Sequence, residues 1–437
     1  MRIGRIFVMA RFYAGATDIP REETTVKTTV TNTPASISRR RLLGAAPAGM
    51  AALALGPSLL TMSRPLSAAL TPVGELQAPD AHGIRLPPGF SSRCIAAAGL
   101  NVRKSWWNTT GYTWHMFPDG GATFDAGDGG WIYVSNSETI GLLGGGASAI
   151  RFNADASVHS AYRILGGSNL NCAGGPTPWN TWLSCEEADF GRVFECDPFG
   201  EKKAVVRHAL GHFKHEAVAV DPVQGLLFLT EDEGDGRLYR FVPDGVNAEG
   251  QLNLTAGVLQ VAAVDEQGFV SWIDLPNPTP NLLQKPTRQQ VPTSTVFKGG
   301  EGIWYSNGFI YFTTKGDNRV WQLDTHLNHL RVLYDAATSG NPILTGVDNL
   351  TMSSGGDILV AEDGGDMQIV VIDQNGNLAP LLQVTGQDGS EITGPAFSPD
   401  GSRLYFSSQR GSAVFGGGKG FGITYEITGP FQEFVRI

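Results

Sequence analysis

The chain has 437 residues, of which 41 % are hydrophobic and 17 % charged, with 56 glycines and 25 prolines. This composition excludes a disordered chain and favours a turn-rich β protein. The formal net charge is −10, and removal of residues 1–68, with nine basic and three acidic side chains, would bring it to −16. Such an acidic protein lacks the basic face that a nucleic-acid partner requires, but it can attract cations.

The N-terminal region, residues 1–69, has the three parts of a twin-arginine export signal in order. Arg39-Arg40-Arg41 comes first, an Ala-, Leu- and Gly-rich run continues to about residue 60, and Ser67-Ala68-Ala69 offers a cleavage point. A basic patch ahead of a short buried helix is the alternative. The signal predicts recognition by the twin-arginine translocase and a periplasmic or secreted protein. That route moves folded proteins, so metals could be loaded and cysteines kept reduced before export.

Residues 70–437 are predicted to form a single domain built on a repeat of about fifty residues. Short apolar stretches end in a polar residue at WIYVSN, TWLSCE, LLFLTE, FIYFTT, DILVAE and RLYFSS. A Gly-rich turn and a second alternating stretch, such as GRVFECD or NRVWQLD, follow each of them, and a shorter element such as HEAVAVD precedes each. This pattern predicts an all-β, six-bladed β-propeller.

One interval of the repeat is longer than the others, at 83 residues, and contains VLQVAAV, FVSWIDL and a Pro-rich segment. We interpret it as one blade with a long insertion, and a seventh blade is the alternative. No stretch after the first seventy residues is long and apolar enough to cross a bilayer, so we expect no stable membrane anchor.

The propeller geometry predicts that acidic residues from different blades meet at one mouth of the channel. The inner strand of a blade and the strand that returns beside it are antiparallel, so the start of one and the end of the other share a face. Carboxylates crowded there repel one another unless cations relieve them. Calcium takes carboxylate oxygens, and ferric iron accepts carboxylates together with a thiolate. The candidates are Cys172, Glu216, Glu301 and Asp348 from inner strands, and Glu186, Glu187, Glu231, Asp232, Glu362 and Asp363 from second strands.

Simpler explanations exist for each of these residues. An acidic pair at a strand end is commonly a solvated turn, and a single cysteine is more often a buried apolar residue than a ligand. Cys172 and Cys185 could also form a disulfide after export. Strand alternation points Cys185 opposite to Glu186, so we expect Cys172 to meet Glu187 around a metal and Cys185 to serve in packing.

The segments NCAGGPTPWNTWLSCEE, GRVFECDP, LGHFKHEAVAVDP and LTEDEGDGRLYRF resemble the PhoX-type alkaline phosphatase family, most densely over residues 166–243. The resemblance implies a six-bladed propeller, twin-arginine export, dependence on Ca²⁺ and Fe³⁺, and hydrolysis of small phosphomonoesters; we expect a monomer. It also implies Cys172 as the thiolate ligand of iron, with carboxylates from Glu187, Glu216 and Glu301. Calcium would then fall to Glu186, Glu231, Asp232, Asp348, Glu362 and Asp363.

Two positions depart from the family pattern. The family has an arginine two residues before the glutamate that matches Glu301, whereas this chain has Gly299. Lys298 is our candidate for the catalytic cation, although lysine offers a point charge and not a bidentate fork. Asn136-Ser137-Glu138 stands where the family has Asn-His-Glu. An exported metal-dependent phosphatase is the leading hypothesis; a calcium-dependent propeller lactonase or esterase and a non-catalytic, calcium-stabilised binding propeller are the alternatives.

Overall fold

The computed structural model describes residues 74–412 and 420–431, which belong to one compact unit. The predicted export signal at residues 1–69 lies outside the described residues. The described residues form β-strands and no α-helix. Their short 3₁₀ helices are η1 (Gly141–Leu143), η2 (His208–Leu210), η3 (Thr287–Gln289) and η4 (Lys315–Asp317). Within the same ranges, no helix combines the length and apolar character that a membrane crossing needs.

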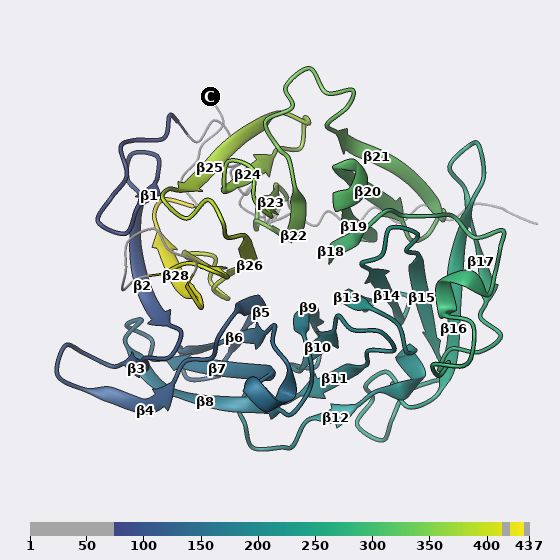
Figure 1. Ribbon diagram of the computed structural model, residues 1–437, viewed down its shortest axis with the longest axis horizontal. Coiled ribbons are helices and arrows are strands. Elements are labelled where there is room, and N and C mark those ends of the chain that lie inside the picture. Colours follow the sequence, from purple (N-terminus) through teal and green to yellow (C-terminus); the bar gives the residue numbers. More distant parts are fainter. Residues whose placement is uncertain (1–73, 413–419, 432–437) are drawn as a thin grey trace, which may run out of the picture. The chain divides into compact units, whose positions relative to one another are not determined.

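Six antiparallel sheets stand around a central axis as the blades of a propeller (Figure 1). The first three blades are β5–β8 (Pro118–Asp125, Trp131–Ser137, Gly146–Phe152, Val158–Gly166), β9–β12 (Asn171–Pro176, Trp182–Glu186, Val193–Cys196, Val205–Val206) and β13–β17 (His215–Asp221, Leu226–Glu231, Leu238–Pro243, Gly257–Val264, Val270–Asp274). The others are β18–β21 (Gly300–Ser306, Phe309–Thr314, Arg319–Asp324, His329–Asp335), β22–β25 (Val347–Met352, Ile358–Glu362, Gln368–Ile372, Leu378–Val384) with β1 (Ile84–Arg85), and β26–β28 (Ile392–Phe397, Arg403–Ser408, Ile423–Thr428) with β2 (Ser91–Ala97). A separate hairpin, β3 (Asn101–Arg103) and β4 (Thr109–Thr113), follows β2.

The ring is closed by strands from the start of the described chain. β1 pairs with β25, and β2 pairs with β28 to complete the sixth blade. Ile84 pairs with Val384 and Ser91 with Thr428, so backbone hydrogen bonds tie the start of the described chain to the fifth and sixth blades. The predicted six-bladed, all-β fold is confirmed.

The long interval of the repeat forms one blade and not two. VLQVAAV and FVSWIDL lie in β16 and β17, which extend the sheet of β13–β15 outward. Residues 275–299 then return to β18 with no strand of their own and only η3 as regular structure. A seventh blade therefore does not form.

The second strands of the blades are buried on both faces, because each sheet packs between two neighbours. β6 and β14 have no exposed residue, which explains why the sequence gives near-continuous apolar runs there. Leu183 and Leu229 from adjacent blades share one core cluster with Tyr239. Each large side chain buried in this way contributes about 1.5–3 kcal/mol.

Each inner strand is bulged where it approaches the site. In all six blades the register between the inner and second strands shifts near that end, for example between His215 and Val218 and between Gly300 and Ile303. A bulge leaves a residue out of the ladder and re-aims its side chain. In five blades the residues left out of the ladder include the inner acid or cysteine of the candidate site: Asp119, Cys172, Glu216, Glu301 and Asp348.

Candidate metal centre

The second residue of each inner strand occupies an equivalent position next to the bulge. Five of the six are potential ligands: Asp119, Cys172, Glu216, Glu301 and Asp348. The sixth is Thr393, whose hydroxyl donates to the carbonyl of Pro118. The four carboxylates of this inner tier are almost fully buried, with exposures of 0–4 %. A six-fold backbone arrangement therefore brings four acids and one thiol, each from a different blade, to one end of the channel.

A second tier is formed by the residue that follows each second strand. These residues are Glu138, Glu187, Asp232, Lys315, Asp363 and Gln409. Apart from the buried Gln409, they are more open than the inner tier, since the side chain of Glu187 is 14 % exposed and that of Asp363 is 35 % exposed. Glu391, just before β26, joins them.

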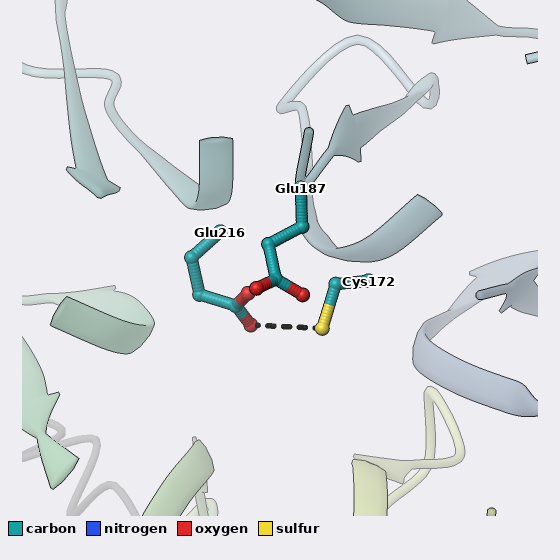
Figure 2. Close-up of side chains that lie close together, drawn as sticks. All are labelled: Cys172, Glu187 and Glu216. Atoms are coloured by element: carbon teal, nitrogen blue, oxygen red, sulfur yellow. Dashed lines mark hydrogen bonds between the residues drawn. The ribbon is translucent and has the colours of Figure 1, made fainter. Parts of the chain in front are cut away.

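Figure 2 shows how Cys172, Glu187 and Glu216 point toward one another. The Cys172 thiol donates to Oε1 of Glu216 over 3.4 Å, and ligand atoms of all three residues lie within 4.8 Å of one another. Oε2 of Glu216 is buried and has no hydrogen-bond partner among the described residues. One sulfur and several carboxylate oxygens, with one oxygen left unsatisfied, fit a bound cation such as iron.

Among the described residues, the carboxylate oxygens of three further groups also lie within 4.8 Å of one another around the mouth. These groups are Glu216, Glu301 and Asp348; Asp348, Asp363 and Glu391; and Asp119, Glu138 and Glu391. They contain oxygen donors only, which suits calcium better than a softer metal. Because Glu216, Asp348 and Glu391 each belong to two groups, the four clusters are linked in one chain of ligands.

Three cations of the described chain lie among these acids and neutralise part of their charge. Nζ of Lys214 is 2.9 Å from Glu187 and 3.5 Å from Asp232. Nζ of Lys315 is 2.8 Å from Glu301 and 3.3 Å from Asp363. Arg410 binds Glu391 and lies 3.9 Å from Glu138.

The acids remain electrostatically strained despite these cations. Burial raises the pKa of Glu187 to about 7, against the opposing effect of Lys214. Burial also raises the pKa of Asp348 to about 7 and that of Glu391 to about 8. The pKa of Glu216 lies well above its usual value because of burial and the neighbouring charge of Glu301. A bound cation would favour the ionised forms of all of them.

Glu186, Glu231 and Glu362, the last residues of second strands, do not join the acid groups of the mouth. Each accepts the backbone N–H of the residue six positions later, at distances of 3.1, 3.2 and 3.0 Å. Glu186 also binds the guanidinium of Arg192, and Glu231 accepts from the hydroxyl of Tyr239. These carboxylates therefore support the turn between the second and third strands.

The other sequence candidates have distinct surroundings. Lys298 is exposed and makes no ion pair within the described part of the chain, so the cation nearest Glu301 is Lys315. Cys172, Cys185 and the other two cysteines are free thiols, and Cys185 is fully buried in the core, as expected.

Sequence reasoning missed Asp119, Glu138 and Glu391. The six-fold pattern contained a signal for two of them, since Asp119 is equivalent to Cys172 and Glu138 to Glu187. Glu391 precedes its inner strand and follows no such rule.

Comparison with known proteins bears on the identity of the site. The family model described as alkaline phosphatase PhoX matches residues 130–189 and 188–332, which include Cys172, Glu187, Glu216 and Glu301. This match covers 203 of the 437 residues. It confirms the resemblance to the PhoX family inferred from the segments around Cys172 and supports a phosphatase. No curated protein matches the chain.

Solved structures of similar fold include Pseudomonas fluorescens PhoX in complex with vanadate, a transition-state analogue. It is 18 % identical, with a TM-score of 0.66 over 82 % of this chain and 98 % of that one, which supports the propeller fold. A Bacteroides thetaiotaomicron protein of unknown function (9 % identical, TM-score 0.47, 78 % and 76 % covered) and a gluconolactonase from Xanthomonas campestris (13 %, 0.43, 83 % and 100 %) are more distant.

Proposed function

We propose that this protein hydrolyses small phosphomonoesters at a calcium and iron centre in the mouth of the propeller. The cluster of Cys172, Glu187 and Glu216 carries the proposal, because its thiol and carboxylate ligand atoms lie within 4.8 Å of one another and the buried Oε2 of Glu216 has no hydrogen-bond partner among the described residues. All three residues lie in the stretch that matches the family.

In this proposal Cys172, Glu187, Glu216 and Glu301 hold iron. Asp348, Asp363 and Asp232 remain the calcium candidates, and Asp119, Glu138 and Glu391 join them on geometry. The predicted calcium roles of Glu186, Glu231 and Glu362 stay predictions that their hydrogen bonds do not favour. When bound, such metals neutralise phosphate oxygens and act as Lewis acids toward the reacting phosphoryl group.

The cationic side chains would hold the remaining charge of the substrate. A Cβ atom at Gly299 would lie 3.8 Å from Cβ of Lys315, so the Lys315 side chain begins beside the position where the family has arginine. Gly299 has φ +63°, so a larger residue there would be strained. We therefore prefer Lys315 to the exposed Lys298 as the group that contacts a phosphate oxygen.

The channel below the acids is narrow, so a substrate would reach them from the mouth of the propeller. Its cavity measures about 30 Å³ and is lined by Gly120, Gly302 and Gly394 among others. A Cβ at Gly120 would lie 2.5 Å from the backbone of Ala173, so these glycines let the inner strands pack closely. Such a volume admits a water or two and excludes a phosphoester.

We further propose export by the twin-arginine route to the periplasm or beyond, and function as a monomer without a nucleic-acid partner. The Arg39-Arg40-Arg41 sequence and the acidic composition support these points. Metal loading before export agrees with four free thiols, since a thiolate ligand must be reduced.

The test combines elemental analysis with turnover of p-nitrophenyl phosphate. We expect iron and calcium in the purified protein, visible absorption from charge transfer to iron, and loss of both colour and activity in Cys172→Ser. Turnover of a lactone or carboxylic ester with calcium alone would favour the lactonase alternative. Metal-free protein that still hydrolyses the phosphoester would contradict the proposal.

A further inference from the structure

The β3–β4 hairpin presents two tryptophans at its tip. Its turn spans Ser105 to Asn108, where the two backbones exchange hydrogen bonds of 3.1 and 3.4 Å. Trp106 and Trp107 occupy the two central positions and are 75 % and 89 % exposed. Figure 1 shows this hairpin at the outer edge of the ring near β8, away from the central channel.

This arrangement has no explanation in folding. Central turn positions favour small or polar residues, and the large apolar surface of tryptophan is normally buried. The two rings contact each other edge to face, with centroids 6.2 Å apart, and belong to no core cluster of the described residues. The base of the hairpin is fixed, however, because Val102 and Trp114 are 1 % exposed and pack in the core. A rigid support therefore holds an apolar tip in solvent.

The charge around this tip is opposite to that of the chain. Residues 81–118 contain no aspartate or glutamate, although the whole chain has a net charge of −10. Arg103 and Lys104 are exposed and form no ion pair in the described ranges, and the Arg103 guanidinium lies 5.8 Å from the Trp106 ring.

A cavity of about 290 Å³ lies between the hairpin and β2. It is lined by Arg103, Lys104 and Arg93, the last of which is paired with Glu426, and by the half-exposed Leu100. Cationic groups thus border an open space that extends to Ser105, the residue before the two exposed tryptophans.

We propose that the hairpin tip binds the surface of an anionic phospholipid membrane reversibly. Tryptophan is enriched where apolar and aqueous phases meet, since its ring is apolar and its N–H is polar. Arg103 and Lys104 would be attracted to lipid phosphates, and the cavity offers room for a headgroup. Two indoles and two or three cations give a weak peripheral contact, distinct from insertion of a spanning segment.

The test is sedimentation of the full-length protein with vesicles of phosphatidylglycerol and phosphatidylcholine at low salt. We expect binding to the anionic vesicles, little to phosphatidylcholine alone, and a loss of roughly tenfold or more in Trp106→Ala/Trp107→Ala. Arg103→Ala/Lys104→Ala should lose a similar factor and most of the salt dependence. Indole fluorescence should be quenched by brominated lipid in the parent protein and not in the double tryptophan variant.

Leu282→Ala/Leu283→Ala is the matched control, because these leucines are 82 % and 97 % exposed on the insertion before β18. It should bind vesicles as the parent protein does. A loss in Leu282→Ala/Leu283→Ala equal to that in Trp106→Ala/Trp107→Ala, no binding to anionic vesicles, or binding to cell-wall polysaccharide with none to vesicles would each overturn the proposal. Phosphatase activity on a soluble substrate should be the same in all of these variants, which separates this inference from the proposed function.

Discussion

At the ends of β14 and β23, two neighbouring carboxylates have opposite surroundings. Glu231 is buried in its blade, where it accepts from a backbone N–H and a tyrosine hydroxyl. Asp232, the next residue, faces the mouth and lies near Lys214. The same division separates Glu362 from Asp363, which is 35 % exposed. Adjacent acids of similar chemistry therefore serve either the support of a turn or the charge of the site.

Strand alternation explains this division, because successive side chains point to opposite sides. The carboxylates that face into the blade, Glu231 and Glu362, have protein donors for their oxygens, and buried carboxylates need such partners. The mouth carboxylates have fewer such donors, and burial together with the charges of neighbouring carboxylates raises the pKa of several of them. Burial raises the pKa of Glu231 and Glu362 to about 7 as well, so the hydrogen-bond partners separate the two sets. Metal binding is thus expected where the protein itself supplies too few cations.

Glu216→Gln tests most sharply whether the carboxylates at the mouth bind metal while those that face into the blade do not. We expect a fall in kcat/KM well above the roughly 10–100-fold typical of outer-sphere partners, with loss of iron. The metal-free variant should unfold at the same temperature as the metal-free parent or higher, since it removes a carboxyl that is costly to bury and that raises its pKa on folding. Elemental analysis and thermal melts with a chelator check both points. Retained iron with full activity would remove Glu216 from the site.

Lys315→Met tests the cation that we assign to the mouth. We expect a loss of about 10–100-fold in kcat/KM and weaker inhibition by inorganic phosphate, because a charge near the phosphate is removed. Lys315→Arg should restore part of the phosphate affinity. Lys298→Met is the comparison, since Lys298 is exposed. A larger loss in Lys298→Met would instead support the cation expected from sequence.

Removal of metal should make stability depend on pH. The folded pKa values of Glu187 and Asp348, each about 7, exceed those of the unfolded chain, so the folded state binds more protons. The stability of metal-free protein should therefore fall as pH rises from about 4.5 to about 8, by on the order of 3 kcal/mol for each such carboxyl. Melting temperatures with a chelator at pH 5 to 8 measure this fall. Added calcium should reverse it at pH 8, and a flat chelated profile would contradict the raised pKa values.

The sequence predicted the blades well because periodicity alone defines them. Every apolar stretch from WIYVSN to RLYFSS is a second strand, and the HEAVAVD and NCAGG elements are inner strands. Their burial on two faces produces a pattern that local reasoning can follow.

The sequence predicted the site less completely, because the relevant detail lies at strand ends. Whether Glu186 or Glu187 faces the mouth depends on where the strand ends and on a bulge, which no local pattern fixes. Asp119 and Glu391 come from blades without an acidic pair, and they reach the site only through closure of the ring. Lys315 lies far in sequence from Asp363, the residue it contacts in the next blade.

Glu231→Gln tests a carboxylate that faces into the blade, and we expect it to change stability alone. The amide keeps an acceptor for the N–H of Arg237 but loses the ion pair with Arg288, whose guanidinium is 3.4 Å away. We expect a cost of about 1–3 kcal/mol, since the hydroxyl of Tyr239 also loses a charged acceptor. Glu233→Gln is matched to it, because Glu233 is 26 % exposed and contacts the same arginine; its cost should be below about 1 kcal/mol. Iron and calcium contents should be unchanged in both variants, and loss of calcium from Glu231→Gln would return this residue to the metal site.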